Sequence, residues 1–182
     1  MHTTLDGFVA GPNGEMDWIK LDYTMFDFVG GFTNEADSAL YGRVTYQMMD
    51  SYWPTAGRQP NASKHDIEHS QWYNKVDKIV LSKTMHNEKK ERTTFLGENI
   101  SNEITALKQQ PGKNILIFGS PTAVHSLMKD NLIDEYWLFV NPIILGKGIP
   151  LFTGLKESIS LKKMTVKEFS CGVIALNYIV EK

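Results

Sequence analysis

The sequence predicts an α/β fold of three layers, in which helices cover both faces of a mixed, mainly parallel sheet. Three observations predict it. Strand and helix patterns alternate along the chain, and the expected strands are short apolar runs, as in sheets that are buried on both faces. Finally, the C-terminal segment contains two runs joined by a glycine-containing turn, which predicts an antiparallel hairpin added to the sheet.

Four buried strands are expected before this hairpin. Each is a short run rich in apolar side chains, and each is followed by a residue that favours a turn or a helix start. The expected strands are Ser38–Tyr41, Lys78–Leu81, Asn114–Phe118 and Tyr136–Val140. The first four residues are typical of the end of a further strand, so a short first strand is also expected.

Helices are expected between these strands, and the hairpin is expected after them. The helical segments carry apolar residues at helical spacing or directly follow a strand. The expected helices are Tyr23–Phe32, Arg43–Asp50, Lys64–Val76, Ile100–Gln109 and Thr122–Lys129, and the hairpin strands are Leu161–Glu168 and Val173–Val180. The segment Asn87–Arg92 mixes both signs of charge and is expected to be a solvated loop.

Length and composition indicate one domain over residues 1–182 and exclude several classes of protein. The apolar and charged fractions, 42% and 22%, are those of a globular chain. A net charge of −2 gives no electrostatic basis for binding nucleic acid or an acidic membrane. A single cysteine excludes an internal disulfide and a cysteine-based zinc site. With no apolar run of about 18 residues and no export signal, the sequence predicts a cytoplasmic protein.

The first strand–glycine–helix junction predicts a site for an anion. Gly42 lets a ligand approach the backbone closely, and the start of the following helix offers unpaired N–H groups. Arg43 stands in the first helical turn, where the helix dipole disfavours a cation, and a bound phosphate removes this conflict. Taken alone, the pattern is slightly more typical of an ordinary turn with an exposed arginine.

A second junction of the same kind follows the strand Asn114–Phe118. Gly119 ends the strand, Ser120 suits a helix N-cap, and Pro121 suits the first helical position. Ligands of open α/β sheets bind at the carboxyl ends of the strands, so two such junctions indicate a dinucleotide held at two points. The segment Ser82–Thr84, after another strand, adds hydroxyl groups and a cation suited to a ribose phosphate.

Other motifs narrow the choice of coenzyme and of chemistry. No acidic residue follows a strand at the spacing that holds a free ribose hydroxyl, which favours NADP over NAD. Neither G-x-G-x-x-G nor G-x-x-x-x-G-K-[ST] is present, which excludes an ordinary Rossmann or P-loop assignment.

His65 and His69 have the spacing of two metal ligands, but no third ligand is evident, and no metal site is predicted. Cys171 has no histidine near it in sequence, which argues against a cysteine nucleophile.

The glycine-rich, acidic segment Leu5–Trp18 is expected to form turns or a lid over a pocket, and the two interpretations are compatible. This segment and four others carry a family resemblance: "TLDGFVAGPNGEMDW", "LYGRVTYQMM", "IVLSKT", "ILIFGSPTAVHSLMKDNLIDEYWLFVNPIILGKGIPLF" and the final hairpin. Together they resemble the dihydrofolate-reductase-like proteins related to the C-terminal reductase domain of riboflavin biosynthesis (RibD). The resemblance covers nearly the whole chain in the same order.

The resemblance implies a dihydrofolate-reductase-like mixed sheet, NADPH as hydride donor and a homodimer. It also assigns roles by motif: Gly42, Arg43 and Thr45 to the coenzyme phosphates, Leu81, Ser82 and Lys83 to the adenosine end, Gly119, Ser120, Pro121 and Thr122 to the pyrophosphate, Leu145, Gly146 and Ala10 to the nicotinamide side, and Asn13, Glu15 and Trp18 to a closing loop. Phe8 stands where the riboflavin reductases carry a lysine associated with their phosphorylated substrate, which makes that particular substrate doubtful.

The sequence therefore predicts hydride transfer from NADPH to a small heterocyclic (pyrimidine- or pterin-like) or carbonyl acceptor, similar to the 5-amino-6-(5-phosphoribosylamino)uracil reductase reaction. The coenzyme carries the reactive chemistry, so the protein must fix geometry, exclude water and deliver a proton. Asp17, in the loop, is the first candidate proton donor; Asp6, Asp27 and an ordered water are the alternatives. The alternatives are a non-catalytic NADP(H)-binding module and a dihydrofolate reductase.

Overall fold

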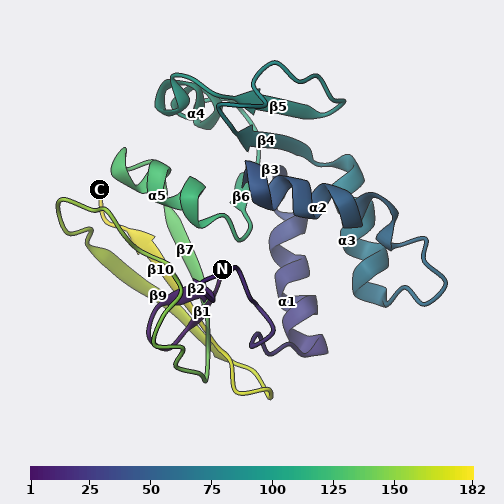
Figure 1. Cartoon of the computed structure of the whole chain (residues 1–182), viewed down its shortest axis with the longest axis vertical. Helices are drawn as coiled ribbons and strands as arrows, with labels where there is room; N and C mark the ends of the chain where they lie inside the picture. Colours follow the sequence, from purple (N-terminus) through teal and green to yellow (C-terminus); the bar gives the residue numbers. More distant parts are fainter. The chain divides into compact units, whose positions relative to one another are not determined.

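The computed structural model describes residues 1–182 and contains two compact units (Figure 1). One unit comprises residues 1–25 and 121–182, and the other comprises residues 26–120. The expectation of a single domain over residues 1–182 stays a prediction.

The unit of residues 26–120 is built on a parallel four-stranded sheet with the order β5-β4-β3-β6. Every neighbouring pair in this sheet is parallel, so the carboxyl ends of all its strands lie at one edge. The strands are β3 (Ala36–Gly42), β4 (Asp77–Leu81), β5 (Thr93–Leu96) and β6 (Asn114–Ile117).

Four helices accompany this sheet: α1 (Tyr23–Asn34), which begins in the other unit, α2 (Arg43–Ala56), α3 (Lys64–Lys75) and α4 (Ile100–Lys108). The start of α3 has a capping box, in which Ser63 and Asp66 satisfy each other's backbone N–H groups. Helix α2 continues past the expected end at Asp50 and through Pro54. None of the helices is long and apolar enough to cross a membrane.

The core of this unit lies between the sheet and the helices α2 and α3. Its buried side chains are mostly aromatic or β-branched and come from all these elements: Ala39, Tyr41, Tyr46, Tyr73, Val76, Val80, Met85 and Phe95. Tyr41 and Tyr73 are among the largest side chains with almost no exposed surface. Burying aromatic rings of this size dominates the packing energy of a small core.

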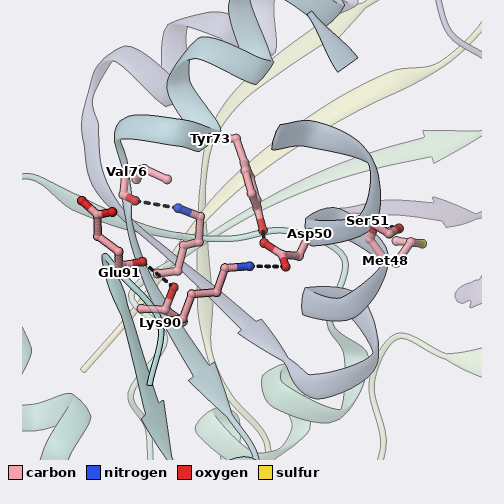
Figure 2. A network of polar contacts seen from close by, with 9 residues as sticks. Met48, Asp50, Ser51, Tyr73, Val76, Lys90 and Glu91 are labelled. Carbon is pink, nitrogen blue, oxygen red and sulfur yellow. Dashed lines mark hydrogen bonds and ion pairs between the residues drawn. The ribbon is translucent and has the colours of Figure 1, made fainter. Parts of the chain in front are cut away.

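A polar network joins the amino-terminal ends of β4 and β5 to the helices (Figure 2). Asp50 of α2 accepts hydrogen bonds from the hydroxyl of Tyr73, at 3.3 Å, and from the ammonium of Lys90. Beside it, the buried Lys78 donates to the carbonyl of Val76 at 3.0 Å and lies over the Tyr73 ring. Burial lowers the pKa of Lys78. The network fixes α2 and α3 at the end of the sheet opposite the strand–glycine–helix junctions.

The unit of residues 1–25 and 121–182 contains two further sheets. The larger has the order β1-β7-β10-β9, in which β1 is parallel to β7 and the other neighbours are antiparallel. The smaller pairs β2 with β8. The elements are β1 (His2–Thr4), β2 (Phe8–Ala10), α5 (Pro121–Lys129), β7 (Glu135–Asn141), β8 (Ile149–Pro150), β9 (Leu161–Glu168) and β10 (Ile174–Val180).

The predicted α/β fold class is confirmed, and the predicted strands, helices and C-terminal hairpin are all present. The structure adds β2, β5 and β8, which the sequence analysis missed because each is only two to four residues long; β5 also follows a charged loop with little apolar signal. It also divides the strands differently: Tyr136–Val140 and the hairpin belong to one hydrogen-bonded sheet, and β3, β4 and β6 to another.

Candidate functional site

The two strand–glycine–helix junctions lie side by side because β3 and β6 are neighbours in the parallel sheet. Two hydrogen bonds connect them directly. The backbone N–H of Gly42 donates to Ser120 Oγ at 2.9 Å, and Thr45 Oγ1 donates to the carbonyl of Gly119 at 3.1 Å. Ser120 and Thr45 are both buried. The structure thus joins the two junctions into one site at the carboxyl edge of the sheet.

This edge is suited to an anion. Gly42, the N-cap of α2, provides no side-chain cap, so the first-turn N–H groups of a 14-residue helix are left for solvent or a ligand. Arg43 is exposed, and Nη1 donates only to Gln47 Oε1, at 3.2 Å, with no carboxylate partner. Gly119 has φ +51, and no atom lies within 4 Å of a Cβ built there, so the backbone is open to close approach.

A cavity of about 410 Å³ opens beyond the neighbouring strands β4 and β5. It is lined by Lys83, His86, Gly97, Glu98, Asn99 and Ile100. Gly97 is needed here because an added Cβ would lie 2.9 Å from the His86 Cβ and 3.1 Å from the Ser82 carbonyl oxygen. The start of α4 lines part of the cavity. Its N-cap residue, Asn99, has φ 49 and makes no side-chain hydrogen bond to the helix.

Ser82 and Lys83, both expected at the adenosine end, differ in what they do. Ser82 is buried, and its hydroxyl accepts from the N–H groups of Thr84 and Met85 at 3.3 and 3.1 Å, so it shapes the turn after β4. Lys83 lines the cavity itself. The sequence analysis missed His86 and Asn99, because they are recognised only once β5 is known to lie beside β4. Leu81, the last residue of β4, is partly buried.

In the other unit, the expected lid is a loop held by its own hydrogen bonds. The Glu15 carboxylate accepts from the backbone and side-chain amides of Asn13 at 2.9 and 2.7 Å, and its carbonyl accepts from Trp18 Nε1 at 3.1 Å. The hydrogen bonds to its carboxylate, that of the Asn13 side chain first, lower the pKa of Glu15. Asp17 is exposed, and its carboxylate makes no hydrogen bond or ion pair.

Asp6 fastens the chain after β1 to the loop that precedes β8. Its carboxylate accepts from Thr4 Oγ1 at 2.6 Å and from the N–H groups of Leu145 and Gly146 at 3.2 and 2.7 Å. These hydrogen bonds, led by that of Thr4, lower the pKa of Asp6. A carboxylate held ionised in this way suits a structural role better than proton donation.

The remaining expected residues have separate surroundings. Asp27, on α1, forms an exposed ion pair with Lys64 at 3.0 Å. Ala10 is buried in β2, and its carbonyl oxygen would lie 2.2 Å from a Cβ on Gly148, which explains the glycine there. Pro121 and Thr122 are the first residues of α5, in the unit of residues 1–25 and 121–182. No group of three or more potential ligands is placed to hold a metal ion.

The chain combines a parallel sheet that has coupled glycine junctions with a mixed sheet that ends in a C-terminal hairpin, and this combination defines a dihydrofolate-reductase-like α/β protein. The model of the RibD C-terminal domain matches residues 1–175, and the chain belongs to that family. Among curated proteins it is similar to two uncharacterized proteins of Bacillus subtilis. YyaP is 36% identical over 96% of this chain and 89% of that protein. YwjB is 28% identical over 97% of this chain and 92% of that protein.

Solved structures show the same fold. A putative riboflavin biosynthesis protein from Shewanella superposes with a TM-score of 0.74 at 22% identity, covering 100% of this chain and 97% of that one. Acinetobacter baumannii RibD superposes with a TM-score of 0.70 at 18% identity, and this chain spans 56% of that longer chain. Dihydrofolate reductase from Enterococcus faecalis, complexed with NADP(H) and RAB-propyl, gives 0.63 at 15%, covering 100% of this chain and 94% of that one.

Proposed function

We propose that this protein is an NADPH-dependent reductase that transfers a hydride to a small heterocyclic or carbonyl acceptor. The observation that carries the proposal is the pair of hydrogen bonds joining the Gly42 and Gly119 junctions at the carboxyl edge of the parallel sheet. They hold an uncapped helix start, an unpaired guanidinium and an open glycine together, which is the chemistry that a pyrophosphate requires. Membership of the RibD C-terminal family supports a reductase.

The residues present fit a phosphorylated dinucleotide. The first-turn N–H groups of α2, with Arg43 and the backbone of Gly119, would hold the pyrophosphate. Lys83 and His86 line the cavity beyond β4, where a cation and an imidazole would hold the additional phosphate of an NADP-type coenzyme. When bound, NADPH supplies the hydride, and the chain itself orients the coenzyme and restricts water.

The proton is a separate requirement of the reaction. Among the three expected donors, Asp6 is engaged by backbone N–H groups and Asp27 by Lys64, whereas Asp17 has no partner. Asp17 is therefore the carboxyl group left available to an acceptor, and we propose it as the donor.

Isothermal titration of NADPH and NADH into the protein tests the coenzyme site. Arg43→Gln should weaken NADPH binding about tenfold, which corresponds to about 1.4 kcal/mol, because one charge-assisted contact to phosphate is lost. Arg58→Gln is the matched control, since Arg58 is an exposed arginine just beyond the opposite end of the same helix. Binding heat for neither coenzyme, or equal loss in both variants, would contradict the proposed site.

Turnover is tested by following NADPH oxidation with a panel of pterin, pyrimidine and quinone acceptors and with dihydrofolate. Oxidation that depends on one ring class identifies a reductase and its acceptor class. Tight NADPH binding with no oxidation across the panel would instead support a non-catalytic binding module, and a response to dihydrofolate alone would support a dihydrofolate reductase.

A further inference from the structure

Six aromatic and imidazole side chains form a group of contacting rings in the unit of residues 26–120. We name them the aromatic cluster. It includes the two histidines whose spacing resembled a metal site. Its members come from α1, α2, α3 and the residue after β6, and each is partly exposed: Phe26, Trp53, His65, His69, Trp72 and Phe118.

The rings of the cluster contact one another in a continuous series. Phe26 stacks on His65, with ring centroids 4.1 Å apart and planes inclined by 19°. The ring centroids of Trp53 and His69 are 4.1 Å apart, and those of His65 and His69 are 5.4 Å apart. Residues 65, 69 and 72 recur at helical spacing, so α3 directs one stripe into the cluster, and Tyr73, four residues after His69, enters the adjoining core against which Trp72 packs.

The cluster is continuous with the proposed coenzyme site through the chain. Phe118 contacts His69 and Trp72, with centroids 5.9 and 5.6 Å apart. The next residue is Gly119, the open glycine of the second junction. A ligand on the cluster would therefore lie beside the edge of the sheet at which we place the coenzyme phosphates.

The electrostatic surroundings favour a ring without negative charge. Burial lowers the pKa of His69 to about 4, and the neighbouring His65 contributes, so the imidazole is neutral at pH 7. Burial also lowers the pKa of His65. Lys64, the residue before His65, is shared between Asp27 at 3.0 Å and Glu68 at 3.9 Å. The cluster itself contains no lysine or arginine that would hold an anion.

The cluster also contains polar groups without partners. Neither imidazole forms a hydrogen bond within the chain, and a neutral imidazole offers one donor and one acceptor. The indole N–H of Trp72 is buried and has no acceptor. Buried donors without partners are rare in folded chains.

We propose that the aromatic cluster binds the planar ring of an uncharged heterocyclic acceptor, which stacks on its rings and is hydrogen-bonded by His65 and His69. The inference rests on the proposed reductase function and narrows its substrate class to rings that lack a phosphate or carboxylate.

A matched pair of fluorescent probes tests this proposal without turnover. Pterin is uncharged at neutral pH, and pterin-6-carboxylate is the same ring with one negative charge. The wild-type protein should bind pterin at least about tenfold more tightly than pterin-6-carboxylate. His65→Phe and His69→Phe keep a flat ring but remove the polar atoms, and each should weaken pterin binding about tenfold. Gln71→Ala, an exposed position of the same helix, is the control.

NADPH affinity, measured in the same variants, separates this inference from the proposed function. The proposal is overturned if the wild type does not bind pterin, if it prefers the carboxylate, or if both histidine variants bind pterin like Gln71→Ala. If pterin binding follows the proposal but neither coenzyme binds, the ring site stands and the reductase function fails. Near-ultraviolet circular dichroism of each variant confirms that a loss of binding does not come from a loss of folding.

Discussion

At the scale of single residues, small hydroxyl side chains decide whether the coenzyme site exists as a unit. Ser120 and Thr45 each cross from one junction to the other, and each is buried where a lost partner cannot be replaced freely by water. The sequence analysis assigned both to the coenzyme phosphates. The structure shows that their side chains form hydrogen bonds to backbone groups of the opposite junction. These bonds hold the two junctions together and leave the exposed N–H groups of the helix start for a phosphate.

His69 gives a prediction at the same scale. Its pKa is about 4 in the folded chain against 6.5 for an ordinary histidine, mainly because it is buried. Between pH 6.5 and 4 the unfolded state therefore binds a proton that the folded state does not, and stability falls as the pH falls. The loss reaches on the order of 3 kcal/mol near pH 4, from the size of this shift.

Urea unfolding of wild type and His69→Phe at pH 7.0 and pH 4.5 checks this. The variant should lose about 2 kcal/mol less than wild type between the two pH values. His2, whose pKa burial also lowers to about 4, remains in both proteins and retains part of the acid sensitivity. Identical losses in wild type and variant would show that His69 titrates normally in the folded chain.

At the scale of elements, α2 has different tasks at its two ends. Its amino-terminal end is uncapped and faces the proposed coenzyme, whereas farther along the helix Asp50 is bound to Tyr73 and Lys90 (Figure 2). The hydrogen bond to Asp50 raises the pKa of Lys90 despite the opposing effect of burial. One helix therefore supplies the ligand-binding edge and is itself held in place at the opposite end of the sheet.

Two substitutions separate these tasks. Ser120→Ala should weaken NADPH binding severalfold, because the Gly42 N–H loses its acceptor and the junctions lose their alignment. Asp50→Asn should lower the free energy of unfolding by about 1 to 3 kcal/mol, because Lys90 loses its charged partner, and should leave NADPH affinity unchanged. Calorimetric titration and urea unfolding of both variants measure the two effects. An equal effect of both substitutions on NADPH affinity would mean that the network and the site are not separable.

At the scale of the whole molecule, one sheet face is more apolar than a solvated face requires. In the sheet β1-β7-β10-β9, Leu176 is paired with Leu138 on one side and with Val166 on the other, and Ile174 is paired with Val140. Val166 and Ile174 are 47% and 39% exposed. We propose that this face packs against a second copy of the chain in a homodimer.

Light scattering at micromolar concentration should then give about twice the monomer mass of 20.6 kDa. Val166→Glu places a charge in the proposed interface and should shift the mass to that of the monomer. Thr165→Glu places the same charge on the opposite face of the same exposed strand and should leave the dimer intact. A monomeric wild type, or equal behaviour of the two variants, would exclude this interface.

The sequence alone determined the identity and order of most elements and the two glycine junctions, because local periodicity and turn chemistry are written in neighbouring residues. It missed β2, β5 and β8, whose two to four residues carry too little signal, and with β5 it missed the cavity that His86 and Asn99 line. It placed Asp6 among the proton donors, although the backbone groups that engage this carboxylate are about 140 residues away in the chain. Only the tertiary structure decided which strands are neighbours and which polar side chains are already bonded, because both depend on contacts between residues far apart in sequence.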